Sequence, residues 1–375
     1  MEKHLHIISF DVPYPPDYGG VVDIFYTIQA LYDAGIAIHL HCFEYGRGKQ
    51  PELESLCASV QYYPRLGGHK CVSPNLPYIV ASRSNSELLD NLLKDDHPIL
   101  VQGIHCTYLL TDPRFDKRKM VVRLCNTEYT YYQHLYKSTP ITSLFRKLYY
   151  RHESKMLKQY EQQIADKVLF LALSDQDVAR YRQDLKAPKI ACLPPMLPYN
   201  EVNSREGIGC FCLYHANLSV MENEKAALWL LQKVFNDLKV PFVIAGKNPS
   251  PKLARIAHQH PHTCLVADPS EQEMQDMIGK AQINILPSFN NTGIKLKLLN
   301  ALFNGRQCVV NDATVQSTGL ESACHIGANA NAFKSLVMQL YHQPFAEEEI
   351  RLRKKLLLSN FDNNRNAQRL IQWIF

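Results

Sequence analysis

Residues 283–311 (INILPSFNNTGIKLKLLNALFNGRQCVVN) contain, in order, an apolar strand, a turn-rich loop, a helix and a second strand. The strand signal is the short apolar run at 283–286, and the loop that follows is rich in Pro, Asn and Gly. Apolar residues then recur at helical spacing until Gly305, a residue typical of a helix end. This order predicts a βαβ unit, in which a crossover helix joins two parallel strands.

Two lysines, Lys295 and Lys297, fall in the first turn of this expected helix. The free N–H groups and the helix dipole already carry positive charge there, so each lysine costs roughly 0.3–1 kcal/mol unless an anion binds. A phosphate group would remove that cost. The alternative is two solvated lysines on a surface helix, because residues two apart do not face the same way.

Strands and helices alternate in both halves of the chain, which is typical of two doubly wound parallel sheets. In the first half, strands are expected at 4–10, 36–43, 60–63, 99–102, 121–124 and 168–173, with a helix at 20–34. In the second half, strands are expected at 210–214, 242–245, 264–266, 283–286 and 308–310. We therefore predict an α/β chain with a first domain at 1–193, a proline-bearing linker at 194–207, a second domain at 208–350 and a C-terminal helix at 351–375.

The segment 283–305 (INILPSFNNTGIKLKLLNALFNG), which begins the predicted βαβ unit, resembles the donor-binding region of retaining GT-B glycosyltransferases of family four, of the bacterial surface-polysaccharide type. In that family, a glycine loop and a helix start hold the diphosphate of a nucleotide sugar. The family's two glutamates, separated by seven residues, align with Thr292 and Asn300, which can still hydrogen-bond hydroxyls but carry no charge. In LYHANLSVMENEKAALW, the family's Arg and Lys align with Asn217 and Asn223.

Two segments of the first half extend this resemblance. The loop 11–20 (DVPYPPDYGG) resembles the family's PxxGG loop, in which glycine lets a phosphate or sugar approach the backbone, although Gly-Gly is also common in plain turns. The segment VVRLCNTEYTYY resembles a strand that ends in His-Asn and is followed by Glu: Asn126 and Glu128 match, and Cys125 stands at the histidine. His105 either supplies the lost imidazole or is a structural histidine at a strand end.

The resemblance implies a GT-B architecture, with two Rossmann-like domains facing a cleft and a C-terminal helix that crosses back to the first domain. The catalytic candidates are His105, Glu128 and Lys295. The acceptor-binding candidates are Tyr18, Asn126 and Glu128. The donor-binding candidates are Gly19, Gly20, Asn217, Asn223, Lys247, Ser288, Thr292, Gly293, Lys295, Lys297 and Asn300. A plain surface role is the alternative for the loop lysine of AGKNP.

The implied enzyme is a hexosyltransferase-like protein of polysaccharide biosynthesis that needs no cofactor and no metal ion. It takes a nucleotide-diphosphate sugar as donor and a glycan or lipid-linked molecule as acceptor, and it retains the anomeric configuration. Asp175 and Asp177 have the DxD spacing of metal-binding carboxylates in another glycosyltransferase fold. Ser174 directly precedes them, however, and predicts a helix cap with both acids in the first turn.

Composition argues against other classes of protein. The 41 basic and 36 acidic residues leave a net charge of +5, too small to indicate a nucleic-acid-binding protein. The 11 cysteines form no CxxC pair, so they indicate neither a zinc site nor a disulfide framework. Nothing in the chain resembles a signal peptide or a membrane span. We expect a cytoplasmic enzyme.

The segment 141–158 (ITSLFRKLYYRHESKMLK) combines five basic residues with an aromatic and apolar strip. Such a helix can rest on an anionic membrane, which would make the enzyme peripheral on the inner face of the cell membrane. The alternative is that the strip packs on the sheet of the first domain and leaves the basic residues in water.

Two other functions stay open. A catalytically silent GT-B subunit that binds nucleotide or another transferase would explain the four substituted family positions. A nucleotide-sugar 2-epimerase shares the fold but would need acid and base side chains that are sparse here.

Overall fold

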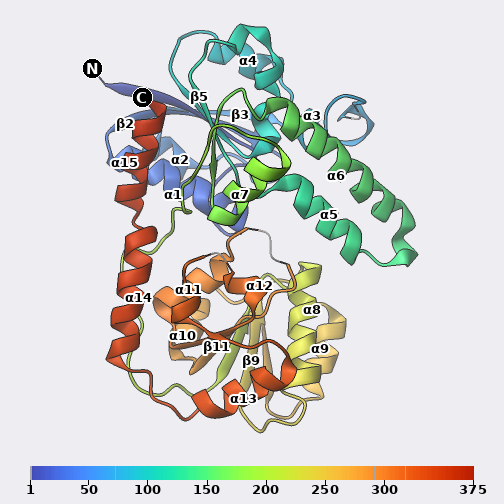
Figure 1. Cartoon of the computed structure of the whole chain (residues 1–375), viewed down its shortest axis with the longest axis vertical. Coiled ribbons are helices and arrows are strands. Elements are labelled where there is room, and N and C mark those ends of the chain that lie inside the picture. Colours follow the sequence, from blue (N-terminus) through green and yellow to red (C-terminus); the bar gives the residue numbers. More distant parts are fainter. Residues whose placement is uncertain (1, 72, 291–292, 317) are drawn as a thin grey trace. The chain divides into compact units, whose positions relative to one another are not determined.

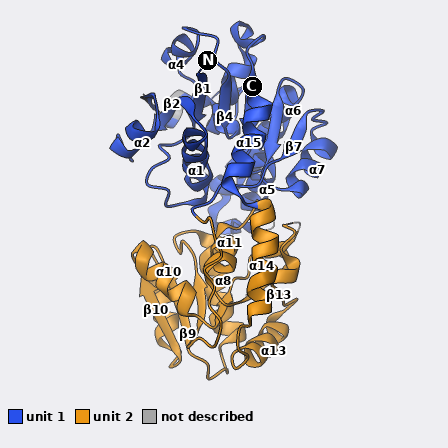
Figure 2. Ribbon diagram, turned by 90° about the vertical axis from the view of Figure 1, so that its left-hand side faces the viewer, with its two compact units in different colours: residues 1–198, 361–375 blue, residues 199–360 orange. Residues whose placement is uncertain are grey.

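The computed structural model describes residues 2–71, 73–290, 293–316 and 318–375, and the chain divides into two compact units (Figures 1 and 2). Unit 1 contains residues 1–198 and 361–375, and unit 2 contains residues 199–360. Each unit has its own parallel sheet covered by helices (Figure 1).

Within the described part of unit 1, seven parallel strands form a sheet in the order β3-β2-β1-β4-β5-β6-β7. The strands are β1 (Lys3–Ser9), β2 (Ile36–Glu44), β3 (Ser59–Pro64), β4 (Ile99–Gln102), β5 (Met120–Arg123), β6 (Leu169–Ala172) and β7 (Ile190–Cys192). The helices are α1 (Gly19–Asp33), α2 (Pro51–Leu56), α3 (Tyr78–Ala81), α4 (Ser86–Leu92), α5 (Glu128–Ser138), α6 (Leu144–Ile164), α7 (Asp175–Asp184) and α15 (Asn363–Ile374). The apolar residues of β4 are completely buried, as expected for a parallel strand with both faces covered.

Within the described part of unit 2, six parallel strands form a sheet in the order β10-β9-β8-β11-β12-β13. The strands are β8 (Cys212–His215), β9 (Phe242–Gly246), β10 (Thr263–Ala267), β11 (Ile283–Ile285), β12 (Gln307–Val310) and β13 (His325–Ile326). The helices are α8 (Met221–Trp229), α9 (Pro251–His258), α10 (Glu271–Lys280), α11 (Leu296–Asn304), α12 (Asp312–Val315), α13 (Ala330–Leu340) and α14 (Glu347–Asn360).

These two sheets confirm the predicted α/β fold class, and every strand expected from the sequence is present to within two residues at each end. Two further strands, β7 and β13, are absent from the prediction. They have three and two residues, which is too short for a periodic signal. The expected βαβ unit is β11–α11–β12, with β11 and β12 paired in parallel.

The segment 194–207 is divided between the units. A buried ion pair joins Arg123 Nε to Asp23 Oδ2 at 2.6 Å, and Asp23 Oδ1 accepts the backbone N–H of Met196 at 2.8 Å. Nη2 of Arg123 donates a hydrogen bond to the backbone carbonyl of Pro194. The first residues of the expected linker therefore belong to the core of unit 1, and the unit boundary falls at residues 198–199.

The C-terminal segment differs from the single helix expected at 351–375. It forms α14 and α15, and only α15 belongs to unit 1, where it packs on α1. Helix α14 belongs to unit 2 because its buried Arg353 donates hydrogen bonds to Ser204 Oγ (3.1 Å) and to the carbonyl of Gly305 (2.6 Å).

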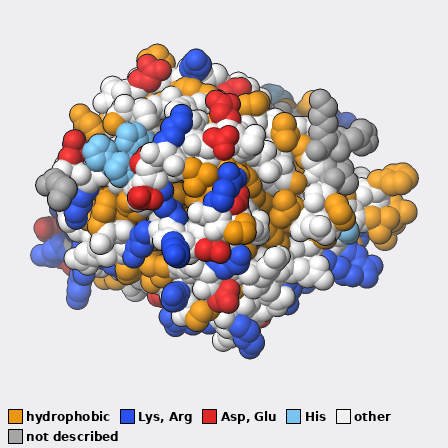
Figure 3. All heavy atoms as spheres, turned by 90° about the horizontal axis from the view of Figure 1, so that it is seen from above, with side chains coloured by type: hydrophobic (Ala, Val, Ile, Leu, Met, Phe, Trp, Pro, Cys, Tyr) orange, Lys and Arg blue, Asp and Glu red, His pale blue; other side chains and the backbone are white. Residues whose placement is uncertain are grey.

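A group of histidines lies near the amino ends of the strands of unit 1. Seen from above, histidine side chains gather in one patch on this face (Figure 3). They come from β1, β2 and the loop that leads into β4. This end of the sheet is opposite to the carboxyl ends of the strands.

Candidate active site

The carboxyl ends of the strands define one candidate site in each unit. In unit 1 the strand order runs outward in opposite directions from β1 and β4, and in unit 2 it does so from β8 and β11. At such switch points, loops leave the two neighbouring strands toward opposite faces of the sheet, and ligands bind in the crevice between them. Most of the predicted site residues lie in the loops that follow these strands or in the first turns of the helices after those loops.

The loop between β1 and α1 is closed by its own side chains. The hydroxyl of Tyr18 donates to Asp11 Oδ2 (2.5 Å), and Asp11 Oδ1 accepts the N–H of Val12 (2.8 Å). Burial, together with the bond to Asp11, raises the pKa of Tyr18 far above its ordinary value. A Cβ atom on Gly20 would lie 2.8 Å from the Tyr18 ring, so glycine is needed for this close packing. Tyr18 thus shapes the loop, and Gly19 begins α1.

Buried polar atoms lie at the same edge of the sheet, on β4 and directly after it. The ring of His105 stacks on Phe10, with the ring centroids 4.7 Å apart. His105 Nδ1 and both polar side-chain atoms of Gln102 are buried and have no hydrogen-bond partner among the described residues. Buried polar groups are normally hydrogen-bonded, so these atoms mark a place for water or a ligand hydroxyl. Gln102 is not a sequence-based candidate, although a polar residue that ends the strand ILVQ is a usable signal.

Arg83 places a buried positive charge near His105 and Glu128. Its Nε donates to the carbonyl of Phe10 (2.8 Å), and one terminal nitrogen donates to the carbonyl of Ile79 (2.9 Å). Burial lowers the pKa of His105 well below its ordinary value, and the charge of Arg83 lowers it further. The imidazole is therefore neutral at pH 7, with one N–H donor and one acceptor nitrogen.

Glu128 is the first residue of α5 and is only 5% exposed. Burial raises the pKa of its carboxyl group to about 7, although the charge of Arg83 and a hydrogen bond from Asn126 act in the opposite direction. Near neutral pH this group exists in both protonation states and can donate or accept a hydrogen bond. Burial raises the thiol pKa of Cys125 well above its ordinary value, so this residue does not replace an imidazole as a base.

In unit 2, the central feature is Lys297, the second residue of α11. Its Nζ lies 3.2 Å from Asn223 Oδ1, 3.4 Å from the Tyr214 hydroxyl and 5.0 Å from the centroid of the Tyr214 ring. Burial lowers the pKa of Lys297 to about 7, and repulsion from Lys295 lowers it further, while Glu222 acts in the opposite direction. An anion bound beside this lysine would favour its charged form.

Both lysines stand at the start of α11 as predicted, with Lys295 at the cap position and Lys297 in the first turn. Gly293, in the preceding loop, has φ +63°, a left-handed conformation that favours glycine. At the end of the neighbouring strand β8, the buried His215 Nε2 has no hydrogen-bond partner within the described chain. Burial lowers the pKa of His215 to about 3, and Lys297 lowers it further, so its ring is neutral.

The two asparagines at the family's Arg and Lys positions are brought together. Asn223 Nδ2 donates to the backbone carbonyl of Asn217 (2.9 Å), and its Oδ1 accepts from Lys297. Asn217 Oδ1 in turn accepts from the N–H (3.1 Å) and the hydroxyl (2.7 Å) of Ser219. The amide of Asn223 therefore accepts a hydrogen bond from a lysine at a place where a second lysine would repel it.

The remaining donor candidates either form hydrogen bonds with nearby residues of their own segment or lie away from Lys297. Ser288 donates its hydroxyl to the backbone carbonyl two residues on (2.8 Å). Asn300 Oδ1 accepts from Asn304 Nδ2 (2.9 Å) on the same helix. Lys247 is exposed in the loop after β9, and Thr292 lies outside the described residues.

Comparison with known proteins identifies proteins of similar sequence and fold. The family model described as Glycosyl transferases group 1 matches residues 210–343, most of unit 2. The chain is 27% identical over 333 residues, 84% of each protein, to an uncharacterized 44.6 kDa protein in the cps region of Klebsiella pneumoniae. A mutant of S. aureus TarM in complex with fondaparinux, α-GlcNAc-glycerol and UDP has a TM-score of 0.69 at 9% identity and 100% coverage of both chains. The fold is that of the GT-B glycosyltransferases.

A second solved structure agrees with this fold. It is described as trehalose-6-phosphate from E. coli bound with UDP-2-fluoro glucose, and it has a TM-score of 0.62 at 11% identity, covering 99% of this chain and 98% of that one. The match of unit 2 to the glycosyltransferase family model and the GT-B fold together support a nucleotide-sugar glycosyltransferase.

The DxD pair of this GT-B protein has the capping geometry expected from the sequence. Ser174 is the N-cap of α7, and its Oγ accepts the backbone N–H of Asp177 at 3.2 Å. Asp177 also accepts a hydrogen bond from Thr127 Oγ1 (2.9 Å), and Asp175 is the first residue of the helix. Both acids therefore stabilise the helix start.

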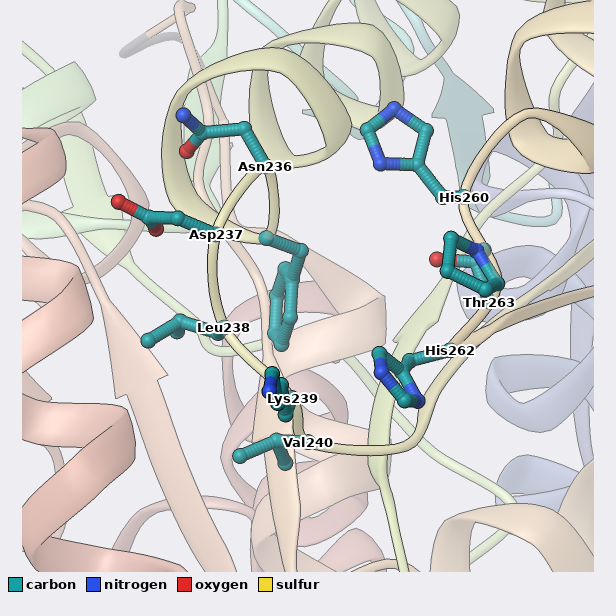
Figure 4. Close-up of a pocket in the computed structure, with 10 residues that line it drawn as sticks. Asn236, Asp237, Leu238, Lys239, Val240, His260, His262 and Thr263 are labelled. Carbon is teal, nitrogen blue, oxygen red and sulfur yellow. The ribbon is translucent and has the colours of Figure 1, made fainter.

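A surface pocket of about 210 Å³ in unit 2 lies away from the switch point (Figure 4). Its labelled residues come from the loop that leads into β9 and from the loop and first residue of β10, with Asn236 and Asp237 on one side and His260, Thr263 and His262 on the other. These loops are at the amino ends of the strands, so this pocket is not the candidate donor site. Among the described residues, no helix is both long and apolar enough to cross a lipid bilayer.

Proposed function

We propose that the protein is a retaining glycosyltransferase that transfers a sugar from a nucleotide-diphosphate donor to a hydroxyl of a glycan or lipid-linked acceptor. Its donor would bind to unit 2 and its acceptor to unit 1. The observation that carries the proposal is Lys297, a partly buried amine at a helix start next to the switch point of a glycosyltransferase-like unit. A helix start of this kind is a favourable place for phosphate groups.

In the proposed reaction, the bond between the sugar C1 and the phosphate oxygen breaks, and the acceptor oxygen forms a bond to C1 on the same face. The acceptor proton passes to the leaving phosphate oxygen. The diphosphate gains negative charge as it departs, and Lys297, Lys295 and the first N–H groups of α11 stabilise it. Donors of this kind contribute about 3–4 kcal/mol each in other enzymes.

Asn217 and Asn223, which stand at the family's Arg and Lys positions, support a diphosphate site that uses the lysines of α11 instead. Asn223 holds the Lys297 ammonium by a 3.2 Å hydrogen bond, and Asn217 fixes Asn223 through its backbone carbonyl. The only cations then needed at the diphosphate are those at the start of α11. We propose that the reaction needs no divalent ion, because the DxD carboxylates cap a helix in unit 1.

On the acceptor side, Glu128, His105 and Gln102 offer polar atoms at the carboxyl edge of the unit 1 sheet. Glu128 has a pKa of about 7 and is held by Asn126, and His105 and Gln102 have buried atoms without protein partners in the described chain. These groups would orient a sugar hydroxyl for attack, with Glu128 accepting its hydrogen bond. A role in surface polysaccharide synthesis is supported by the relative in a cps region.

We also propose peripheral contact with the cytoplasmic face of an anionic membrane through the tip of the α5–α6 hairpin. Ile141 is 80% exposed and Phe145 is 91% exposed, and Leu144 and Leu148 are also exposed. The buried residues of α6 begin only at Glu153, so its first two turns project from the sheet (Figure 1). Apolar side chains next to basic ones suit a surface that offers both hydrocarbon and negative charge.

The test of the donor proposal is a thermal-shift screen of the full-length protein against nucleoside diphosphates and their sugars, followed by calorimetry. A ligand that binds the folded state raises the melting temperature by mass action. If NMR of the product shows that the transferred sugar keeps its anomeric configuration, the result would support the retaining reaction. No shift with any nucleotide would contradict the proposal.

A second candidate is a GT-B subunit that binds nucleotide without turnover. It is favoured by Asn300, whose side chain is engaged with Asn304 on its own helix at the place of a family glutamate. Tight nucleotide binding with no transfer and no donor hydrolysis would identify this function.

A further inference from the structure

The amino-terminal edge of the unit 1 sheet carries three imidazoles on three separate segments. His4 is on β1, His39 is on β2, and His97 is in the loop before β4. One ring nitrogen from each lies within 4.8 Å of the other two. All three side chains are partly exposed, and Figure 3 shows the histidine patch on the surface. Four intervening residues separate His4 from the last residue of β1, so the cluster is about 16 Å from the carboxyl edge, at 3.3 Å per residue.

We propose that His4, His39 and His97 bind one divalent transition-metal ion of the zinc class. Imidazole is a preferred ligand of Zn²⁺, Ni²⁺ and Cu²⁺ but not of Mg²⁺ or Ca²⁺. Three histidines leave one position of a tetrahedral ion for water.

The distances fit such an ion with small side-chain movement. Zinc–nitrogen bonds of about 2.0–2.1 Å in a tetrahedron place ligand nitrogens about 3.3–3.4 Å apart. His4 Nδ1 and His39 Nε2 are already 3.1 Å apart. The ligand nitrogens of the three rings all lie within 4.8 Å of one another, so the His97 nitrogen has to approach by no more than about 1.5 Å, which is within the reach of ring rotation.

The supporting contacts are those of a metal-binding histidine. His39 Nδ1 lies 2.9 Å from Ser59 Oγ, and an N–H donated there leaves the lone pair of Nε2 facing His4. Ligand histidines in metal sites are commonly oriented by a hydrogen bond of this type on their other nitrogen. Ser59 is therefore a positioning residue for the site.

The loop that bears His97 is fixed by charge-assisted hydrogen bonds. The N–H of His97 donates to Asp95 Oδ1 (3.0 Å), and Arg118 donates to Asp95 Oδ1 (2.8 Å) and to the carbonyl of His97 (2.7 Å). The third ligand is thereby placed before any ion arrives.

A second pair of histidines lies deeper and does not compete for the ion. His6 Nδ1 is 2.9 Å from His41 Nε2, His6 Nε2 is 3.0 Å from Asp95, and His41 Nδ1 is 3.0 Å from the Tyr63 hydroxyl. All four ring nitrogens are therefore engaged, and both rings are buried.

The test uses the full-length protein without a histidine tag, titrated with ZnCl₂ by calorimetry in a buffer that does not chelate zinc. We expect one zinc ion per chain and a higher melting temperature with Zn²⁺ but not with Mg²⁺. His97→Gln should weaken zinc binding at least tenfold, and Ser59→Ala should weaken it about tenfold to a hundredfold. His4→Gln, at the rim of the sheet, serves as a second ligand variant if His97→Gln does not fold.

The matched control is the double variant His260→Gln and His262→Gln, which removes the two histidines of the unit 2 pocket in Figure 4. It should bind zinc as the unmodified protein does. Visible absorption of the Co²⁺ form at one equivalent should show the strong bands of a four-coordinate site with three nitrogen ligands and should lose them in the ligand variants. Equal zinc affinity of the unmodified protein, His97→Gln and His4→Gln would overturn the proposal, as would no binding of stoichiometric zinc.

Discussion

Lys297 Nζ lies 3.2 Å from Asn223 Oδ1, so the amine at the start of α11 is held by an amide from the first turn of α8. The two residues are 74 positions apart in the sequence and come from opposite sides of the switch point between β8 and β11. The amide orients the lysine without competing for its charge. We propose that a positive charge in this place binds an anion, and the first two predictions concern this lysine.

Removing either lysine should weaken binding of a nucleoside diphosphate. Lys297→Ala and Lys295→Ala should each reduce the binding free energy by about 1.5–3 kcal/mol, the scale of a hydrogen bond to a charged group. Isothermal titration calorimetry measures this binding free energy, with the nucleotide that gives the largest thermal shift as the ligand. Lys247→Ala, in the exposed loop after β9, is the comparison: a loss as large as that of Lys297→Ala would move the phosphate site toward that loop.

Donor binding should also depend on pH through Lys297. The pKa of this lysine is about 7, so its ammonium form is complete well below pH 7 and declines above it. A nucleotide sugar keeps the same diphosphate charge over this range, so its affinity should fall as pH rises from 6.5 to 8.5. Lys297→Arg keeps a permanent charge, and its calorimetric titrations should be nearly flat over these values. An equally steep profile in that variant would assign the pH dependence to another group.

The local part of this site could be predicted from the sequence, and the tertiary part could not. The β11–α11–β12 unit and both lysines follow from apolar spacing and glycine positions within 29 residues. Arg83 and His215 become site candidates only because the fold buries them beside residues that are distant in the chain, and no local pattern predicts that. The same is true of His4, His39 and His97, because only the parallel register of β1, β2 and β4 brings them together.

Two buried glutamates in unit 1 should make its stability fall as pH rises. Burial raises the pKa of Glu128 to about 7 and that of Glu161 to about 8, both above the ordinary value. Each protonated group favours the folded state below the unfolded pKa near 4.5, and that contribution is lost as pH rises through the folded pKa. The melting temperature of unit 1 should therefore decrease between pH 5 and 8. Calorimetric melting should show a flatter decrease for Glu161→Gln, whereas Glu54→Gln, at an exposed position, should behave as the unmodified protein.

Glu128 should matter more for turnover than for folding. Glu128→Gln keeps the size of the side chain and its hydrogen bonds to neutral groups but removes the charged acceptor, so kcat/KM for transfer should fall about tenfold to a hundredfold. Donor affinity should be unchanged, because Glu128 belongs to unit 1 and the donor candidates around Lys297 belong to unit 2. Steady-state transfer assays combined with donor calorimetry test this. An altered donor affinity with normal kcat would place Glu128 outside the acceptor site.

Transfer should continue in the presence of a chelator. The DxD carboxylates are held at the start of α7, where Asp177 accepts from Ser174 and Thr127. The assay is best made with the His97→Gln variant, so that removal of a zinc ion from the histidine cluster does not affect the result. Turnover that is lost with EDTA and restored by Mn²⁺ or Mg²⁺ in this variant would contradict a metal-independent reaction.

The α5–α6 hairpin tip should bind anionic vesicles through apolar and basic side chains together. Each basic residue near an anionic surface contributes about 1 kcal/mol, so changing Arg146, Lys147 and Arg151 to Gln should remove most binding at low salt. Changing Ile141 and Phe145, the two most exposed apolar side chains of the tip, to Ser should weaken binding at high salt as well, because apolar burial is not screened. Flotation with phosphatidylserine vesicles measures both effects.

The control for the hairpin variant changes Arg351, Lys354 and Lys355, three exposed residues of α14, to Gln and alters the net charge equally. If this control loses as much binding as the hairpin variant, the attraction comes from net charge alone and the hairpin is not the docking surface.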